Sequence, residues 1–531
     1  MPAPASVALH QYSPGALDRE TLQYLLVGRQ KLAESLFEEV DQAAGSGTPR
    51  FFLLIGPRGI GKSHLMTLLY KRVCDDLSER VIPVKFAEEE YSIFRASDFF
   101  LRVLEEMGAR IVDVVGDDQL ARDVAVDTLR GIASREGRQI VIFVENIHEL
   151  FTQMDRCEIQ ALRSVFQQTN IFSVVASAPQ IFPGVSDHDE PFYNFFRIFH
   201  LQELKCAEIK ELMKRAAQIN GNTAFAENFQ DYEPTIEALF SLIGGNPRLA
   251  IRLYEAISQG RTGGAAEIFS GMMDGETPYY REVFQRLTGQ RRLILDTILC
   301  RETPLTPKKI AEISRLDPAV VNAQLRRLER DGYVTSRPMG KRTSYEVRDR
   351  LLRLWRVMRR PAGRERLTAF IRFLEAWHGR PAVTREEPLQ ESLAPYVAGR
   401  RDERPADPAE AVLDLAFEEL LAGNRANGIS LIAEAYGHVS RLDPATAERM
   451  ATGFLKRIIE EGEVSLIKDA VHAIIASWGP DYEKFLEPVL DAVAIIEAQD
   501  TRLYYTRLQP EERVVVAGIV RAITGSEEPG V

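Results

Sequence analysis

The sequence has few cysteines for its length. Only four occur among 531 residues, and none belongs to a CxxC pair or stands near a group of histidines. This spacing excludes a disulfide framework and a zinc knuckle, so we expect free thiols in a reducing compartment. Long apolar runs are also missing, because 51–56 and 141–144 are far shorter than the roughly 20 residues that cross a bilayer. The first 20 residues show no basic start followed by an apolar stretch, so we expect a soluble cytoplasmic protein.

Composition and charge narrow the class of protein further. Hydrophobic residues make up 45% and charged residues 27% of the chain, which excludes a largely disordered or collagen-like protein. The length predicts three or four domains at roughly 150 residues each. The net charge of −11 is uneven: residues 301–360 hold 16 Lys and Arg against 7 Asp and Glu (+9), and the rest holds 50 against 70 (−20). A nucleic acid should therefore meet only this one basic region.

Residues 20–260 alternate short apolar runs with longer helical patterns. The apolar runs are 51–55, 81–86, 139–144 and 172–177. This alternation is typical of βαβ units around a parallel sheet. We therefore predict an α/β core for this part of the chain.

Residues 56–63, with the sequence GPRGIGKS, fit the pattern GxxxxGK[ST] between a predicted strand and a predicted helix. Such a loop lets backbone N–H groups converge on phosphate oxygens at a helix N-terminus. Lys62 is expected to reach the β- and γ-phosphates of ATP, and Ser63 to place its hydroxyl on Mg²⁺. The other residues predicted to line the nucleotide here are Gly56, Pro57, Arg58, Gly59, Ile60, Gly61 and His64. A glycine-rich turn that binds nothing is the alternative.

A second part of the nucleotide site is expected where the apolar run 139–144 ends. Glu145 can bind the shell of Mg²⁺, whereas Asn146 stands where a neighbouring acid would activate the attacking water. An amide cannot accept that proton, so Asn146 predicts slow ATP hydrolysis unless His148 or Glu149 takes over the role. The alternative, which we favour, is that His148 and Glu149 are only the partly exposed start of the next helix.

These residues resemble the AAA+ and STAND P-loop ATPases, especially the branch of origin-recognition and archaeal-type ATPases. YLLVGRQ (24–30) is similar to the VGR-type segment before the P-loop, FSVVASAPQIF (172–182) to the sensor-1 strand, and GGNPR (244–248) to the start of the sensor-2 helix. The resemblance implies that Val27, Gly28 and Arg29 help to hold the adenine. It also implies that Ser177 detects the γ-phosphate and that Arg248, after Pro247, reaches the nucleotide from a helical lid.

The stretch 191–204 resembles the step from the ATPase core into that lid. Arg197 stands where many relatives carry an arginine that acts across a subunit boundary. A surface arginine near the last strand is the alternative. A lid arginine on the γ-phosphate would convert the presence of that phosphate into a domain angle.

Residues 285–360 have the pattern of a winged helix-turn-helix. Helices are predicted at 291–300 and 306–314, a third opens at Asp317 and stops at Gly332, and two short strands follow over 333–347. This order resembles the MarR-type domain that follows the ATPase in archaeal-type relatives. In such a domain the third helix enters the major groove of DNA and the wing touches the backbone. The candidates for DNA contact are Asn322, Gln324, Arg326, Arg327, Arg337, Lys341 and Arg342. The alternative role is a protein-docking spacer.

Residues 411–525 show only helical periodicity, which favours an α-solenoid with a concave surface for a partner protein. A plain helical bundle is the alternative. A linker is predicted before this helical region, because residues 378–408 carry five prolines and many charges. The expected domains are an AAA+-like P-loop ATPase core (1–204), a helical lid (205–284), a winged helix (285–360), a helix and linker (361–408) and a helical repeat-like domain (409–531).

The sequence therefore predicts an ATP-binding, slowly hydrolysing molecular switch with ATP and Mg²⁺ as ligands. Its nucleotide state would set engagement with DNA through the winged helix or with a partner protein through the C-terminal helices. A second hypothesis is an oligomeric, DNA-bound initiator, loader or motor ATPase in which Arg197 acts across a subunit boundary. A third is a transcriptional regulator with a vestigial nucleotide site. No membrane partner is expected.

Overall fold

The chain divides into two units. Unit 1 comprises residues 1–227 and 245–255, and unit 2 comprises 228–244 and 256–531. The computed structural model describes residues 14–88, 90–109, 117–258, 264–301, 303–339, 342–379, 408–498, 504–505 and 508–525. Most of the predicted linker at 378–408 therefore lies outside the described residues. No helix within the described segments is both long enough and apolar enough to cross a bilayer.

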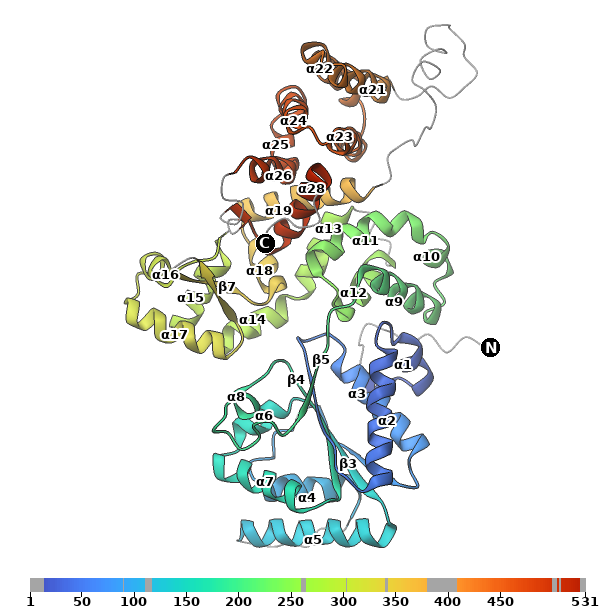
Figure 1. Cartoon of the computed structure of the whole chain (residues 1–531), viewed down its shortest axis with the longest axis vertical. Helices are drawn as coiled ribbons and strands as arrows, with labels where there is room; N and C mark the ends of the chain where they lie inside the picture. Colours follow the sequence, from blue (N-terminus) through green and yellow to red (C-terminus); the bar gives the residue numbers. More distant parts are fainter. Residues whose placement is uncertain are drawn as a thin grey trace. The chain divides into compact units, whose positions relative to one another are not determined.

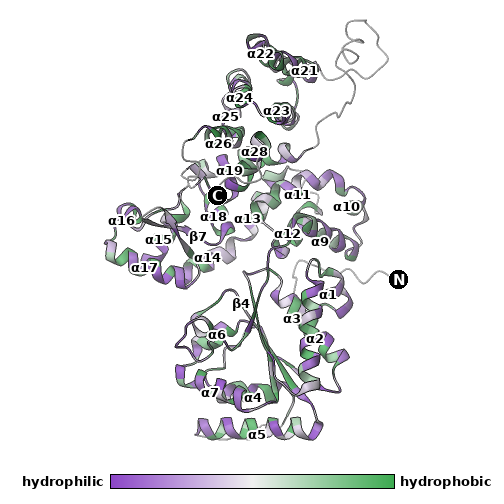
Figure 2. Cartoon of the chain, viewed as in Figure 1, coloured by the Kyte–Doolittle hydropathy of each residue, from purple (hydrophilic) through white to green (hydrophobic). Residues whose placement is uncertain are grey.

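Unit 1 is built on a parallel sheet of five strands in the order β2-β3-β4-β1-β5 (Figure 1). The strands are β1 (Phe51–Ile55), β2 (Val81–Lys85), β3 (Gln139–Val144), β4 (Phe172–Ala178) and β5 (Arg197–His200). The four apolar runs predicted as strands are thus confirmed. In Figure 2 the strands in the middle of the sheet are coloured mainly as hydrophobic, and every residue of β3 and β4 is buried because helices cover both faces there. Both ends of the edge strand β5 are exposed.

Helices surround this sheet on both sides (Figure 1). They are α1 (Arg19–Leu25), α2 (Gln30–Ser46), α3 (Lys62–Asp76), α4 (Ala96–Glu106), α5 (Asp118–Glu136), α6 (Ile147–Gln153), α7 (Arg156–Gln168) and α8 (Pro183–Ser186), after a 3₁₀ turn η2 (Pro14–Ala16). α9 (Cys206–Ile219) and α10 (Thr223–Glu227) follow the last strand, and α12 (Pro247–Ser258) contributes residues 247–255 to this unit. The core holds a cluster of phenylalanine rings, among them Phe99, Phe166 and Phe192.

The register of the strands sets the place of the predicted nucleotide site. Ile55 of β1 pairs with Ala178 of β4, and Lys85 of β2 pairs with Phe143 of β3. The carboxyl ends of parallel strands share one edge of a sheet, so the residues that follow them meet there. Segments far apart in sequence therefore converge beside the loop after β1.

Unit 2 contains the predicted winged helix. Its elements are α15 (Gly289–Leu299), α16 (Pro307–Ser314), α17 (Pro318–Arg330), β6 (Val334–Met339) and β7 (Arg342–Val347). The predicted helix starts are confirmed, because the side chains of Thr306 and Asp317 accept hydrogen bonds from the first turns of α16 and α17. The two strands form an antiparallel ribbon, and Leu325 and Leu328 of α17 are fully buried.

The rest of unit 2 is helical. Before and after the winged helix lie α11 (Phe229–Ile243), α13 (Ala265–Gly275), α14 (Thr277–Arg286), α18 (Arg350–Met358) and α19 (Pro361–His378). The C-terminal helices are α21 (Pro408–Leu421), α22 (Arg425–Val439), α23 (Pro444–Glu460), α24 (Val464–Trp478), α25 (Asp481–Phe485), α26 (Glu487–Glu497) and α28 (Pro510–Thr524). α22 packs on α24, α24 on α26 and α26 on α28, while α19 packs on α11, α13, α23 and α25. The all-helical character predicted for this region is confirmed.

Candidate nucleotide-binding site

The loop between β1 and α3 has a backbone that glycine adopts easily and other residues do not. The φ angles of Gly59 and Gly61 are +82° and +100°. A Cβ atom added to Gly61 would lie 2.7 Å from Nη1 of Arg29, and one on Gly59 would lie 2.7 Å from Oδ1 of Asn246. The loop thus needs both the conformational freedom and the small size of glycine. It leads directly into α3, whose first N–H groups have no partner within the helix and suit an anion.

Lys62, the first residue of α3, reaches back into this loop. Its Nζ donates hydrogen bonds to the carbonyl oxygens of Gly56 at 2.7 Å and Pro57 at 3.3 Å. Burial lowers the pKa of Lys62 to about 8, although the negative charge of Glu145 opposes the change. The ammonium group is therefore mainly charged at pH 7 and able to attract a phosphate group.

Glu145 follows β3, and its side chain is only 4% exposed. Its Oε2 accepts a hydrogen bond from the hydroxyl of Ser63, and its Oε1 lies 3.5 Å from Nζ of Lys85. The structure brings together the two residues predicted to hold Mg²⁺, and their hydroxyl and carboxylate oxygens are ligands that Mg²⁺ prefers. Lys85 was missed by the sequence reasoning. A charged residue that ends an apolar strand is the signal that points to it.

Asn146 has a left-handed backbone with a φ of +52°, a conformation that asparagine tolerates better than most residues. Its N–H donates a hydrogen bond to Oγ of Ser177 at 3.3 Å. The predicted water position and the predicted γ-phosphate sensor are therefore neighbours. The amide of Asn146 can donate or accept a hydrogen bond, but it cannot take up a proton.

His148 lies in the first turn of α6, two residues after Asn146. Its Nδ1 is buried and has no hydrogen-bond partner among the described residues. Burial lowers the pKa of His148 to about 4, and the nearby charge of Lys62 acts in the same direction. The imidazole is thus neutral at pH 7, and one ring nitrogen can accept a hydrogen bond. Glu149 is exposed at the same helix start.

The segment 27–29 supports the loop through contacts within unit 1. Arg29 donates hydrogen bonds to the carbonyl oxygen of Ile60 and, at 2.8 Å, to that of Gln202. It therefore ties the phosphate-binding loop to the residues after β5. Gly28 has a φ of +70°, which favours glycine, and a Cβ atom there would lie 2.5 Å from Oε1 of Glu208 and displace that side chain. Val27 is buried.

His64, also predicted to line the nucleotide, is buried in α3. Its Nε2 lies 2.8 Å from the carbonyl oxygen of Leu22 in α1. Burial lowers the pKa of His64 to about 4, so the ring is neutral at pH 7 and can donate its N–H to that carbonyl. Its visible contact fastens α3 to α1.

The segment 245–248 contacts the phosphate-binding loop directly. The backbone N–H of Arg248 donates to the carbonyl oxygen of Gly59 at 3.3 Å, and Nδ2 of Asn246 donates to that of Arg58 at 3.0 Å. Pro247 is the first residue of α12. The predicted lid arginine thus stands beside the loop, and Asn246 is a contact that the sequence reasoning missed. A polar residue just before the helix-opening proline is the signal for it.

Arg197 lies at the start of β5, and its side chain is 60% exposed. Its guanidinium pairs with the carboxylate of Glu39 in α2 and lies 5.1 Å from the ring centre of Phe199. These contacts hold Arg197 on the outside of the sheet edge. The structure therefore groups Lys62, Ser63, Glu145, Asn146, Ser177 and Arg248 around one loop, and it places Arg197 with another set of neighbours.

In the winged helix, Asn322, Arg326 and Arg327 are exposed on α17. Gln324 is half-buried and shares hydrogen bonds at 3.4 Å with Gln290 and Arg291 of α15. In the ribbon, Arg337 is exposed and Nε lies 2.5 Å from a carboxylate oxygen of Glu346. Lys341 lies outside the described residues, and Arg342 is described only by its backbone.

Two known protein families match this chain, one over the candidate nucleotide site and one over the winged helix. Residues 25–174 match the AAA ATPase domain family, a range that includes the phosphate-binding loop, Glu145 and the first three residues of β4. Residues 287–335 match the winged helix-turn-helix DNA-binding family. No curated protein matches the sequence.

Several solved structures resemble the chain at low identity. The Walker-type ATPase of Pyrococcus abyssi is 14% identical, with 65% of this chain and 99% of that chain covered and a TM-score of 0.46. The ORC2 protein of Aeropyrum pernix is 15% identical, with 62% and 92% covered and a TM-score of 0.44. The ORC1 protein of the same organism, solved in complex with DNA, is 16% identical, with 65% and 97% covered and a TM-score of 0.42. Values this low carry no functional inference. The family matches, together with the geometry of the loop, show that the chain contains an AAA ATPase domain followed by a winged helix-turn-helix domain.

Proposed function

We propose that the protein is an ATP-dependent molecular switch that hydrolyses ATP slowly and controls contact with DNA. The observation that carries this proposal is the pair of hydrogen bonds from the segment 245–248 to the phosphate-binding loop at Arg58 and Gly59. Any shift of the loop on binding phosphate is passed to the start of α12 through these bonds. A loop coupled to a helix in this way can convert nucleotide state into a change of conformation.

The residues present fit Mg²⁺ and a nucleotide. Lys62 would attract the β- and γ-phosphates, while Ser63 and Glu145 would supply oxygen ligands for the metal. Lys85, 3.5 Å from Glu145, holds that carboxylate in place on its other side. When bound, Mg²⁺–ATP supplies a phosphoanhydride bond whose terminal phosphate can pass to water. Arg248 and Ser177 are our candidates for detecting the γ-phosphate, and Val27 to Arg29 for the adenine side.

Slow hydrolysis follows from Asn146 and His148. Asn146 can hold a water molecule by a hydrogen bond but cannot remove its proton. His148 can accept a hydrogen bond at Nδ1, but a base with a pKa of about 4 drives proton removal weakly at pH 7. We therefore expect a turnover well below the enzyme median of about 10 per second.

Contact with DNA is assigned to the winged helix. Asn322, Arg326 and Arg327 are exposed on α17, the helix that enters the major groove in this fold. The basic excess of the chain is concentrated in the same part of the sequence. A few base-edge contacts from α17, with phosphate contacts from the ribbon around Arg337, Lys341 and Arg342, would give specific but salt-sensitive binding.

The test combines two measurements on the full chain. Steady-state ATP hydrolysis is measured with and without duplex DNA, and DNA affinity is measured by fluorescence anisotropy with ADP or with a non-hydrolysable ATP analogue. We expect slow turnover and a DNA affinity that differs between the two nucleotides. The double variant R326E/R327E should lose DNA binding, while R130E/R135E, which reverses two exposed arginines of α5, should retain it. Brisk turnover that ignores DNA, together with equal DNA affinity in both states, would overturn the switch.

An oligomeric initiator or loader is the second candidate. The exposure of Arg197 favours it, because an arginine at a sheet edge can reach the nucleotide of a neighbouring copy. The mass in solution with a non-hydrolysable ATP analogue decides between the switch and the oligomeric initiator or loader. A monomer in every nucleotide state would exclude the oligomeric candidate. The proposed domains are a core (1–204), a lid (205–284), a winged helix (285–360), a linker region (361–408) and the C-terminal helices (409–531). The C-terminal helices are our candidate surface for a protein partner. A DNA-binding regulator with a vestigial nucleotide site would bind DNA but not ATP.

A further inference from the structure

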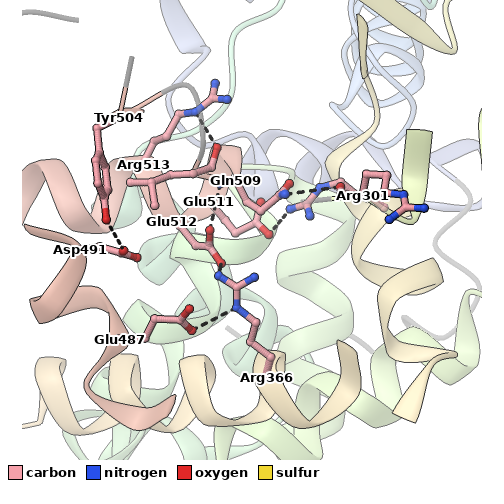
Figure 3. A network of polar contacts seen from close by, with 11 residues as sticks. Arg301, Arg366, Glu487, Asp491, Tyr504, Gln509, Glu511, Glu512 and Arg513 are labelled. Atoms are coloured by element: carbon pink, nitrogen blue, oxygen red, sulfur yellow. Dashed lines mark hydrogen bonds and ion pairs between the residues drawn. The ribbon is translucent and has the colours of Figure 1, made fainter. Parts of the chain in front are cut away.

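Unit 2 contains a pocket of whose lining residues the functions above use only Arg337. Its volume is about 250 Å³, and its walls come from the end of α15, the ribbon β6–β7, the start of α18 and the start of α28. Six arginines line it: Arg301, Arg337, Arg348, Arg350, Arg353 and Arg513. We call it the arginine pocket. Figure 3 shows three residues of its wall, Arg301, Gln509 and Arg513, and the side chain of Gln509 donates a hydrogen bond to the carbonyl oxygen of Arg301 at 3.5 Å.

Positive charge exceeds negative charge in the arginine pocket. Glu346 is the one carboxylate among the described residues that line it, and its carboxylate lies 2.5 Å from Arg337. Arg353 pairs with Glu511 behind the wall, where both side chains are less than 10% exposed. The six guanidinium groups, the carboxylate of Glu346 and the carboxylate of Glu511 behind the wall sum to a formal charge of +4. Like charges that line one pocket are costly unless an anion joins them.

Arg350 and Arg513 also donate hydrogen bonds to neutral backbone groups. Nε of Arg513 donates to the carbonyl oxygens of Tyr505 at 3.0 Å and Leu508 at 2.9 Å, and Nη1 of Arg350 donates to that of Ser241 at 3.4 Å. Burial lowers the pKa of Arg513, and the charges of Arg337 and Arg353 act in the same direction, while Glu346 and Glu511 oppose them. Backbone carbonyls orient these guanidinium groups but do not cancel their charge.

The pocket also holds an acceptor that lacks a donor. Oε2 of Glu346 is buried and makes no hydrogen bond within the described residues, and it lies 3.9 Å from Nη1 of Arg513. A ligand that offers hydroxyl or amino groups next to its negative charges would satisfy this oxygen. Sulfate or phosphate alone would satisfy only the arginines.

We propose that the arginine pocket binds a small organic phosphate with at least two phosphate charges and neighbouring hydroxyl groups, a ligand of nucleotide size or smaller. Guanidinium forks match phosphate oxygens two at a time, which makes arginine the residue for such a ligand. The volume is close to the lower end of the roughly 300–1,000 Å³ of ordinary ligand pockets. The ligand would bridge the winged helix and α28, so its presence would tie the C-terminal helices to the DNA-binding domain.

The experiment uses the full chain with K62A, so that the phosphate-binding loop of unit 1 contributes little. Inorganic pyrophosphate, ADP and inorganic phosphate are titrated separately by calorimetry at 150 mM salt. We expect one site per chain, with ADP and pyrophosphate binding at least tenfold more tightly than phosphate. ADP binding tighter than pyrophosphate would identify an organic ligand that also satisfies Glu346. Hydrogen exchange should show protection of 334–347 and 508–513 on binding.

The variant R301E/R348E tests the site, because both arginines are exposed and reversing them should leave the fold intact. It should weaken binding at least tenfold, whereas R281E/R441E, which reverses two exposed arginines of unit 2 away from the pocket, should not. If the reversal variant fails to fold, R301Q gives a smaller loss in the same direction. No binding of ADP or pyrophosphate at millimolar concentration, or equal binding by both variants, overturns the proposal. So does a reversal variant that keeps ADP binding and loses duplex DNA, because the pocket would then be a DNA phosphate contact.

Discussion

The phosphate-binding loop and the arginine pocket attract anions in opposite ways. The loop is one contiguous stretch, 56–63, with a single lysine at a helix start and a nearby carboxylate that balances it. The pocket collects six arginines from segments more than 200 residues apart, and Glu346 is the one carboxylate among its described lining residues. The first site depends on backbone shape, because Gly59 and Gly61 need positive φ. The arginine pocket depends instead on the summed positive charge of its arginines.

This difference predicts how each site responds to substitution. A site made by backbone shape and one lysine should fail abruptly when either is changed. A site made by many cations should lose affinity in steps, because each removed guanidinium leaves the others in place. Variants that separate an abrupt from a graded response therefore test whether the two sites are distinct.

The largest expected effect is that of K62A on ATP binding. The loss of the ammonium group removes its charge-assisted contacts with the phosphates, so ATP affinity at the loop should fall roughly 100-fold. Calorimetry with Mg²⁺–ATP measures it, and K71A, the same change further along α3, is the matched control. Pyrophosphate binding at the arginine pocket should be unchanged. A parallel loss of pyrophosphate binding would mean that the chain has one anion site rather than two.

The next effect concerns turnover at the first site. N146D places a carboxylate where the amide stands, keeps its size and tolerates the left-handed backbone. A positioned base contributes about 10²-fold or more, but aspartate is one carbon shorter than the usual glutamate, so we expect a gain of roughly tenfold. Steady-state ATP hydrolysis measures it. N194D is the matched control, because Asn194 is exposed and has nearly the same φ of +51°. A turnover of N146D equal to that of the wild type would show that another step limits the rate.

The same contrast explains what the sequence could predict. The loop, the sheet and the caps at Thr306 and Asp317 were predicted because each depends on residues close together in the chain. The grouping of Ser63 with Glu145 followed from the rule that parallel strands end at one edge. Features that depend on the spacing of residues along the chain can be predicted from the sequence alone.

Other contacts depend on tertiary packing and left only weak traces. Lys85 at the end of β2 and Asn246 just before α12 reach the nucleotide site from separate segments, and their local signals do not show which distant residues they contact. The arginine pocket needed the placement of α28 against the ribbon, and the sequence showed only an excess of arginine in 301–360. That excess was interpreted as a DNA surface, yet part of it lines a pocket instead.

The smallest expected effect tests the charge balance near the arginine pocket. Glu512 of α28 contacts Arg366 at 3.2 Å (Figure 3). The preceding residue, Glu511, pairs with Arg353. Burial raises the pKa of Glu512 to about 7, and the charge of Glu511 adds to this, although Arg366 opposes it. Between pH 4.5 and 7 the folded chain keeps a proton that the unfolded chain has released. The free energy of unfolding should therefore fall as the pH rises through this window, and remain level with respect to this group above it.

E512Q removes this titration and keeps the size of the side chain. Urea unfolding at pH 5 and pH 8 should show the variant gaining stability over the wild type by roughly 2 kcal/mol at pH 8 relative to pH 5. E365Q, an exposed position in α19, gives the effect of the substitution alone. If E512Q and the wild type lose stability equally between the two pH values, Glu512 is charged in the folded chain. Its negative charge would then offset the arginines, and the excess of positive charge around the pocket would be smaller than its wall alone indicates.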